Sequence, residues 1–245
     1  MGRFATHALW VACTASAGCY DLGGLRAGAG GSRCGDLGVQ LCESFESGVL
    51  DPRWRMVGHN VTVSVDDSFA FRGTHSLRID GMMATSGDVQ GEILESDTLP
   101  ATDIFMRGYW YFPSTTPPTA IRLMTPFQTD APFTGVGLSV AARSSGFVPE
   151  TFNGVTGMTT SSQLPGFAVG RWVCIEWEVL AGAPGRTRVW VDDVEYGDLA
   201  TMQNTNPTPP FGTIGFGMLH ASGAPAHSIW LDDLDVDTQR ITCAR

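Results

Sequence analysis

The stretches RTRVWVDDVEYGDL (residues 186–199) and SIWLDDLDVDT (residues 228–238) decide the expected fold. Each alternates apolar and polar residues through a tryptophan and a pair of aspartates. Side chains of a β-strand point alternately to opposite faces of a sheet, so this period of two predicts strands with one buried face. RWVCIEWEVL (residues 171–180) shows the same alternation. These segments indicate the closing strands of a sandwich.

Most of the remaining chain consists of short strand-like runs between turn residues, such as HNVTVSVDD (59–67), IFMRGYWYFP (104–113) and FGTIGFGML (211–219). The 30 glycines and 14 prolines suit many turns. Residues 144–170, rich in Gly, Ser and Thr, are expected to form a long surface loop. No amphipathic helix is evident, and the sequence therefore predicts an all-β sandwich.

The order of the motifs carries a family resemblance. FESG and LDPRW stand near the start, FMRGYWYFP and RWVCIEWEV follow, and RVWVDDVEYGDL and IWLDDLDV close the chain. This order resembles the laminin-G-like branch of the concanavalin A-like lectin and glucanase superfamily. The resemblance covers roughly Cys42 to Asp237 and implies a two-sheet antiparallel jelly-roll sandwich, which we expect to form one domain over residues 34–245. It implies no single activity, because the fold hosts lectins, hydrolases, lyases and adhesion modules.

The N-terminus reads as an export signal. Residues 1–18 have a short polar start, an apolar run and small residues, which is the pattern of a signal peptide. Ser16-Ala17-Gly18-Cys19 resembles a bacterial lipobox and predicts lipidation of Cys19; an ordinary signal peptide cleaved nearby is the alternative. The Gly-rich residues 19–33 predict a flexible tether. We therefore expect a bacterial outer-membrane or cell-surface lipoprotein, or otherwise a secreted or periplasmic protein.

Apart from Cys13 in the leader and Cys19 in the lipobox, four cysteines remain, and an even number in an exported chain predicts two disulfides. We favour Cys34–Cys42, which closes a small loop ahead of the first strand, and Cys174–Cys243, which pins the chain end to a strand. Cys42–Cys243 is an alternative that would join the two termini. The absence of any C-x-x-C spacing argues against a zinc cluster.

Composition excludes some partners. The formal net charge is −10, and all fifteen basic residues are arginines. An acidic chain is a poor match for nucleic acid, whose phosphates require a basic patch. The same charge weighs against a highly anionic polysaccharide unless arginine is concentrated locally. No other segment is apolar for long enough to form a transmembrane helix.

The best candidate binding residues lie in the segment 107–111, where alternation puts Arg107, Tyr109 and Tyr111 on one face. The opposite, more apolar face suits the core, so we expect these three side chains to project outward onto a concave sheet. Tyrosine rings can stack on sugars, and arginine can pair with carboxylates or hydroxyls. The resemblance adds that lyases of this fold use a tyrosine base with Arg and Gln neutralising a uronate. Ordinary cross-strand aromatic pairing is the alternative.

Acidic residues give weaker candidates. Glu176 and Glu178 share a strand face at about the 6.5–7 Å spacing of alternate residues, near the carboxylate spacing of inverting glycosidases. Glu92 and Glu95 do not match the superfamily's glucanase motif, since they fall on opposite faces. Asp192-Asp193 is expected to be a hairpin turn, whereas Asp232-Asp233 lies within a strand.

The Asp232-Asp233 pair, together with Glu46, is a candidate structural calcium site by resemblance, although calcium needs more oxygen ligands than these carboxylates supply. No other cofactor is expected. The histidines form no sequence cluster, although His75 or His220 could serve a lyase.

These observations favour a monomeric, non-catalytic glycan-binding or adhesion module. The alternatives are a polysaccharide-degrading enzyme, a lyase rather than a glycoside hydrolase, and a structural envelope protein.

Overall fold

The computed structural model describes residues 34, 40–95, 102–114, 120–127, 136–144, 146–153, 156–182, 184–200, 212–221 and 223–243. Within these residues fifteen strands form two antiparallel sheets, and the short 3-10 helix η2 (Gly197–Leu199) follows β13. Sheet A contains β1 (Leu41–Glu43), β3 (Val61–Asp66), β4 (Ser76–Gly81), β6 (Asp103–Tyr111), β11 (Trp172–Leu180), β12 (Arg186–Val191), β13 (Val194–Glu195) and β15 (His227–Asp237). Sheet B contains β2 (Arg55–His59), β5 (Val89–Glu95), β7 (Ile121–Phe127), β8 (Val136–Arg143), β9 (Gly146–Asn153), β10 (Met158–Ser161) and β14 (Thr213–His220).

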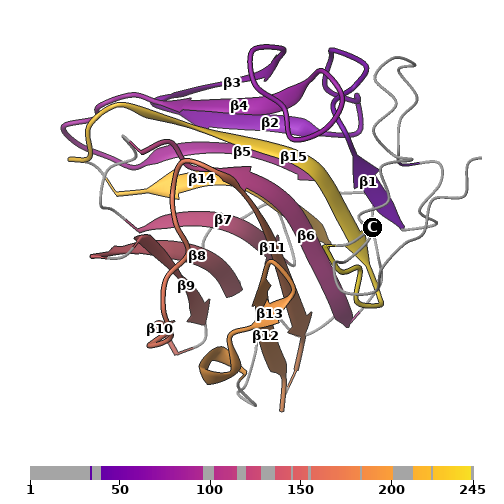
Figure 1. Cartoon of the computed structure of the whole chain (residues 1–245), viewed down its shortest axis with the longest axis vertical. Helices are drawn as coiled ribbons and strands as arrows, with labels where there is room; N and C mark the ends of the chain where they lie inside the picture. The colour runs from indigo at the N-terminus through magenta and orange to yellow at the C-terminus, as the bar shows by residue number, and fades with distance from the viewer. Residues whose placement is uncertain are drawn as a thin grey trace, which may run out of the picture.

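The strand orders show that neighbours in space are often distant in sequence. Sheet A runs β13-β12-β11-β6-β15-β4-β3, with β1 also paired to β15, and sheet B runs β10-β9-β8-β7-β14-β5-β2. In Figure 1 both sheets bend in the same sense, and β7 and β8 lie inside the arc formed by β15 and β6. The outer face of sheet B is thus on the inside of the bend, and the outer face of sheet A is on the outside.

Alternation along the strands builds the core between the sheets. On β6 the residues Met106 and Trp110 are fully buried and belong to the core, as do Ile175 and Trp177 of β11. Sheet B contributes side chains such as Phe216 to the same cluster. The core side chains alternate along strands of two antiparallel sheets, and the predicted antiparallel sandwich is confirmed.

The two aspartate pairs adopt the predicted backbone roles. Val191 pairs with Val194, so Asp192 and Asp193 form a two-residue turn, with φ values of 49° and 65°. Positive φ at both positions is characteristic of a type I′ hairpin. Asp233 instead lies inside β15, with φ of 44°, where the register with β6 shifts.

The expectation of a long loop at residues 144–170 is wrong, because β9 and β10 occupy much of this segment and pair with each other. Polar residues at the edge of a sheet need no continuous apolar face. The Gly, Ser and Thr residues of segment 144–170 therefore lack a clear apolar alternation, which is why β9 and β10 at the edge of sheet B were not predicted.

Both favoured disulfides are present. Cys34 and Cys42 are joined with a Cα–Cα distance of 5.3 Å, and Cys174 and Cys243 with one of 5.9 Å. The expected signal peptide (1–18), tether (19–33) and lipidated Cys19 lie outside the described residues and stay predictions. No described helix is long and apolar enough to cross a membrane.

Candidate functional site

The sequence-predicted residues lie on the outer face of sheet A. Arg107 pairs with Glu176 of the neighbouring strand β11, and Tyr109 pairs with Cys174. Directly opposed residues share a face, so Arg107, Tyr109, Tyr111, Glu176 and Glu178 point away from the core. The predicted alternation is therefore correct.

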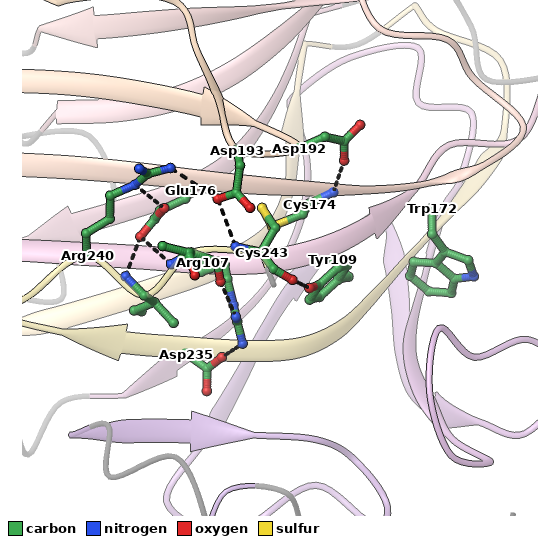
Figure 2. Close-up of a disulfide and its surroundings, with 12 residues drawn as sticks. Arg107, Tyr109, Trp172, Cys174, Glu176, Asp192, Asp193, Asp235, Arg240 and Cys243 are labelled. Atoms are coloured by element: carbon green, nitrogen blue, oxygen red, sulfur yellow. Dashed lines mark hydrogen bonds and ion pairs between the residues drawn. A yellow bond between two sulfur atoms is a disulfide. The ribbon is translucent and has the colours of Figure 1, made fainter. Parts of the chain in front are cut away.

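This face is covered rather than open, which corrects the expectation of a concave binding surface. Arg107 and Glu176 are 0% exposed, and Tyr109 is 4% exposed. The C-terminal segment that follows β15 passes over them, held by the Cys174–Cys243 disulfide (Figure 2). Because a ligand meets side chains only where they are exposed, these residues are not accessible in this arrangement.

Strand β15 and the covering segment supply the partners of the buried charges. The guanidinium of Arg107 forms an ion pair with Asp235 and donates a hydrogen bond to the carbonyl of Thr242 (2.6 Å). The Glu176 carboxylate accepts a hydrogen bond from the N–H of Ile241 (2.6 Å) and pairs with Arg240 (3.1 Å), as Figure 2 shows. These contacts make the cluster a structural clamp on the chain end.

The other two candidates on this face also have partners. Glu178 is 1% exposed and forms an ion pair with Arg186 of the neighbouring β12. Tyr111 is half-buried and packs edge-on against Phe69, with ring centroids 4.3 Å apart. Tyr111 is thus the predicted site residue that keeps some contact with solvent.

The acidic residues suggested for calcium bind main-chain N–H groups. The Asp232 carboxylate accepts hydrogen bonds from Phe71 (2.8 Å) and Arg72 (3.1 Å), and Glu46 accepts one from His75 (3.0 Å). Burial, and next the charge of Asp233, raise the pKa of Asp232 to about 9. Among the described residues no group of three or more His, Cys, Asp or Glu is placed to hold a metal ion. Calcium binding stays a prediction.

A row of mostly polar side chains crosses the outer face of sheet B, which the sequence did not reveal. The strand registers place one residue of each strand in line across the sheet. Apolar residues that alternate with them along the strands point to the opposite face and belong to the core. The polar row consists of His59, Gln90, Leu219, Arg122, Ser139, Glu150 and Ser161.

Two ionisable groups of this face have perturbed environments. Glu92, next to the polar row, is 2% exposed and accepts a hydrogen bond from the Gln90 amide (2.7 Å). Burial raises the pKa of Glu92 and lowers the pKa of Arg122. The Arg122 guanidinium lies 4.9 Å from the ring centroid of Phe152, and its buried Nε has no hydrogen-bond partner among the described residues. Perturbed pKa values and unpaired polar atoms gather preferentially at functional sites.

Glycine makes room for the arginine. A Cβ atom at Gly137 of β8 would lie 2.9 Å from the Arg122 Nε, closer than real Cβ contacts. A Cβ at Gly217 would likewise lie 2.9 Å from the Glu92 Cγ. Gly137 and Gly217 therefore leave space on this face in which the side chains of Arg122 and Glu92 can lie across the neighbouring strands.

Comparison with known proteins supports the fold. The chain has the fold of a jelly-roll sandwich. Cellulose-induced protein Cip1 superposes with a TM-score of 0.65 at 16% identity, covering 83% of this chain and 100% of that protein. An endo-β-1,4-glucuronan lyase from the fungus Trichoderma reesei gives 0.61 at 13% identity, covering 82% and 96%. Alginate lyase vAL-1 from Chlorella virus gives 0.55 at 9% identity, covering 76% and 93%.

No family model matches the chain, and no curated protein sequence matches it. At these identities the structural likeness establishes the fold alone. The two-sheet jelly-roll sandwich expected from the motifs is thereby supported, whereas membership of the concanavalin A-like superfamily and of its laminin-G-like branch stays a prediction.

Proposed function

We propose that the chain is a non-catalytic module that binds polysaccharide along the polar row of sheet B. The observation that carries the proposal is Arg122, which is half-buried, has its guanidinium over Phe152 and has an Nε without a partner in the described part of the chain. Amide, hydroxyl and carboxylate groups beside an aromatic ring suit sugar hydroxyls and sugar faces, because binding sites combine apolar contact with a few placed polar groups.

A weakly charged polysaccharide fits this face best. The net charge of −10 repels a highly anionic chain at long range. On the face itself Glu92 and Glu150 accompany Arg122, so no excess of positive charge gathers there. The structural neighbours Cip1 and the two lyases, named for cellulose induction and for the cleavage of uronate polymers, support a role connected with carbohydrates.

A lyase is the second candidate, and one observation favours it. His59, Gln90 and Arg122 lie in one line, which offers a base and two groups able to neutralise a uronate carboxylate. The tyrosine base implied by the family resemblance has no counterpart on this face. Tyr109 and Tyr111 lie on sheet A, and the Tyr196 hydroxyl donates a hydrogen bond to the carbonyl of Pro165 (2.9 Å). The remaining tyrosine, Tyr20, lies in the predicted tether.

The test is binding to soluble polysaccharides, neutral and uronate-containing, with absorbance at 235 nm recorded in parallel for unsaturated products. We expect binding of a neutral polysaccharide without product, and Arg122→Met should weaken that binding. Arg143→Met, on the exposed end of β8, is the matched control and should bind as the wild type does. Product that disappears in His59→Ala would instead establish the lyase, and binding unchanged in Arg122→Met would place the ligand elsewhere.

A further inference from the structure

Two histidines meet at one end of the sandwich, between the sheets. His220 ends β14 of sheet B, and His227 begins β15 of sheet A. Their ring centroids are 4.9 Å apart, and the residues are only 4% and 8% exposed. They lie 7 residues apart in the chain, but a loop separates them, so their proximity is a product of the two-sheet packing.

Hydrogen bonding assigns the tautomer of both rings. His220 Nδ1 lies 2.7 Å from the carbonyl oxygen of Ala221, and His227 Nδ1 lies 3.0 Å from that of Pro225. A carbonyl oxygen only accepts hydrogen bonds, so each Nδ1 carries the hydrogen and each neutral ring presents a lone pair at Nε2. Both Nε2 atoms are buried, and neither has a partner in the described part of the chain.

This arrangement is the one that metal-binding histidines adopt. A ligating histidine almost always donates its second ring N–H to a carbonyl or carboxylate, which holds the ring and its tautomer in place. A buried acceptor left without a donor or a cation costs about 1–3 kcal/mol. Two such acceptors side by side therefore point to a bound group that accepts electron pairs.

Because Gly81 has no side chain, Met218 and His220 can approach the backbone of β4 closely. His227 pairs with Gly81 across β15 and β4, and the two therefore share a face. A Cβ at Gly81 would lie 3.5 Å from the His220 Nε2 and 2.7 Å from the Cε of Met218. The methyl end of a thioether thus borders the same space as the imidazole nitrogen.

We propose that His220, His227 and Met218 form a site for a soft monovalent cation, Cu⁺. Thioether ligands select Cu⁺, and imidazole suits copper. Among the described residues no third histidine, cysteine or carboxylate completes a group here, so a hard cation that prefers oxygen has no ligand set. The site faces the core, away from the polar row of sheet B, and is independent of glycan binding.

The first measurement uses the Cys13→Ser/Cys19→Ser variant, because the thiols of these two cysteines would bind Ag⁺ whereas the other four are in disulfides. The probe is Ag⁺, which resembles Cu⁺ and undergoes no redox change under these conditions. Calorimetric titration should give one equivalent bound. In protein labelled with ¹⁵N-histidine, Ag⁺ should shift the Nε2 resonances of two histidines that are in the Nδ1–H tautomer. Absence of binding, or binding that leaves these two Nε2 resonances unchanged, overturns the proposal.

Variants locate the ligands. His220→Asn and His227→Asn can retain a donor near the position of Nδ1 while deleting Nε2, so affinity should fall by more than the roughly 10–100-fold cost of losing an outer-sphere partner. His75→Asn is the control and should bind Ag⁺ as the wild type does, since His75 lies beside Glu46 and away from this pair. Equal affinity in the double variant His220→Asn/His227→Asn, or a preference for Zn²⁺ over Ag⁺ at these histidines, overturns the assignment.

Discussion

The clamp on the chain end predicts unequal roles for the two disulfides. Cys174 and Cys243 are 69 residues apart in sequence, whereas Cys34 and Cys42 are 8 apart. A cross-link stabilises the folded state mainly by restricting the unfolded chain, and the effect grows with the logarithm of the closed loop. This relation gives about 4.4 kcal/mol for the longer loop and about 2.5 kcal/mol for the shorter one at 25 °C. We therefore expect removal of the Cys174–Cys243 bond to cost about 2 kcal/mol more.

The perturbation is the double variant Cys174→Ala/Cys243→Ala, compared with the matched double variant Cys34→Ala/Cys42→Ala. Unfolding in urea, followed by the fluorescence of the seven tryptophans, measures the free energy of unfolding of each. The same curves on the wild type with and without a reductant separate loss of the bonds from loss of the side chains. An equal or smaller cost for the Cys174/Cys243 variant would refute the loop-closure reasoning.

Three further outcomes follow from the buried charges. Asp235→Asn should lower the free energy of unfolding in urea by about 3–5 kcal/mol, because it leaves the buried Arg107 charge without its carboxylate. The double variant Arg107→Met/Asp235→Leu should recover much of that loss; no recovery would contradict this. Since burial raises the pKa of Glu92 above its ordinary value of 4.5, the folded state holds that proton more tightly, and the stability it contributes at low pH is lost as pH rises through the raised pKa. Glu92→Gln should therefore flatten the stability profile above pH 4.5, as measured by unfolding across pH; an unchanged slope would count against it. Gly137→Ala should weaken polysaccharide binding by displacing Arg122, while leaving the far-ultraviolet circular dichroism unchanged; wild-type affinity would show that Arg122 does not need this space.

Local pattern was enough for several conclusions. The alternation through Trp190 and Trp230 predicted strands, and the Asp192-Asp193 pair predicted a hairpin turn. These succeed because side-chain direction in a strand and positive φ in a two-residue turn depend on neighbouring residues. The even number of cysteines likewise led to a favoured pairing that the structure contains.

Local sequence pattern could not show that the predicted candidate site is covered. Arg107 and Glu176 were correctly placed on the face opposite the core, yet residues 240–243 from the far end of the chain bury them. Periodicity indicates which side of a strand faces the core between the sheets. It carries no information on whether a further segment of the chain packs against the opposite side. Glu92 was set aside for failing a known motif, although burial on the outer face of sheet B raises its pKa.

By itself, the sequence determined the all-β class and the strands that close the sandwich, and it favoured, without deciding, the cysteine pairing that the structure contains. Only the tertiary structure decided which face is available. The polar row takes one residue from each of seven strands between His59 and Leu219, and the His220–His227 pair forms where two sheets meet. The polar row depends on strand order and register, which arise from packing between distant segments, so no window of sequence contains it. The two histidines are close in sequence, but the contact between their rings depends on how the two sheets pack.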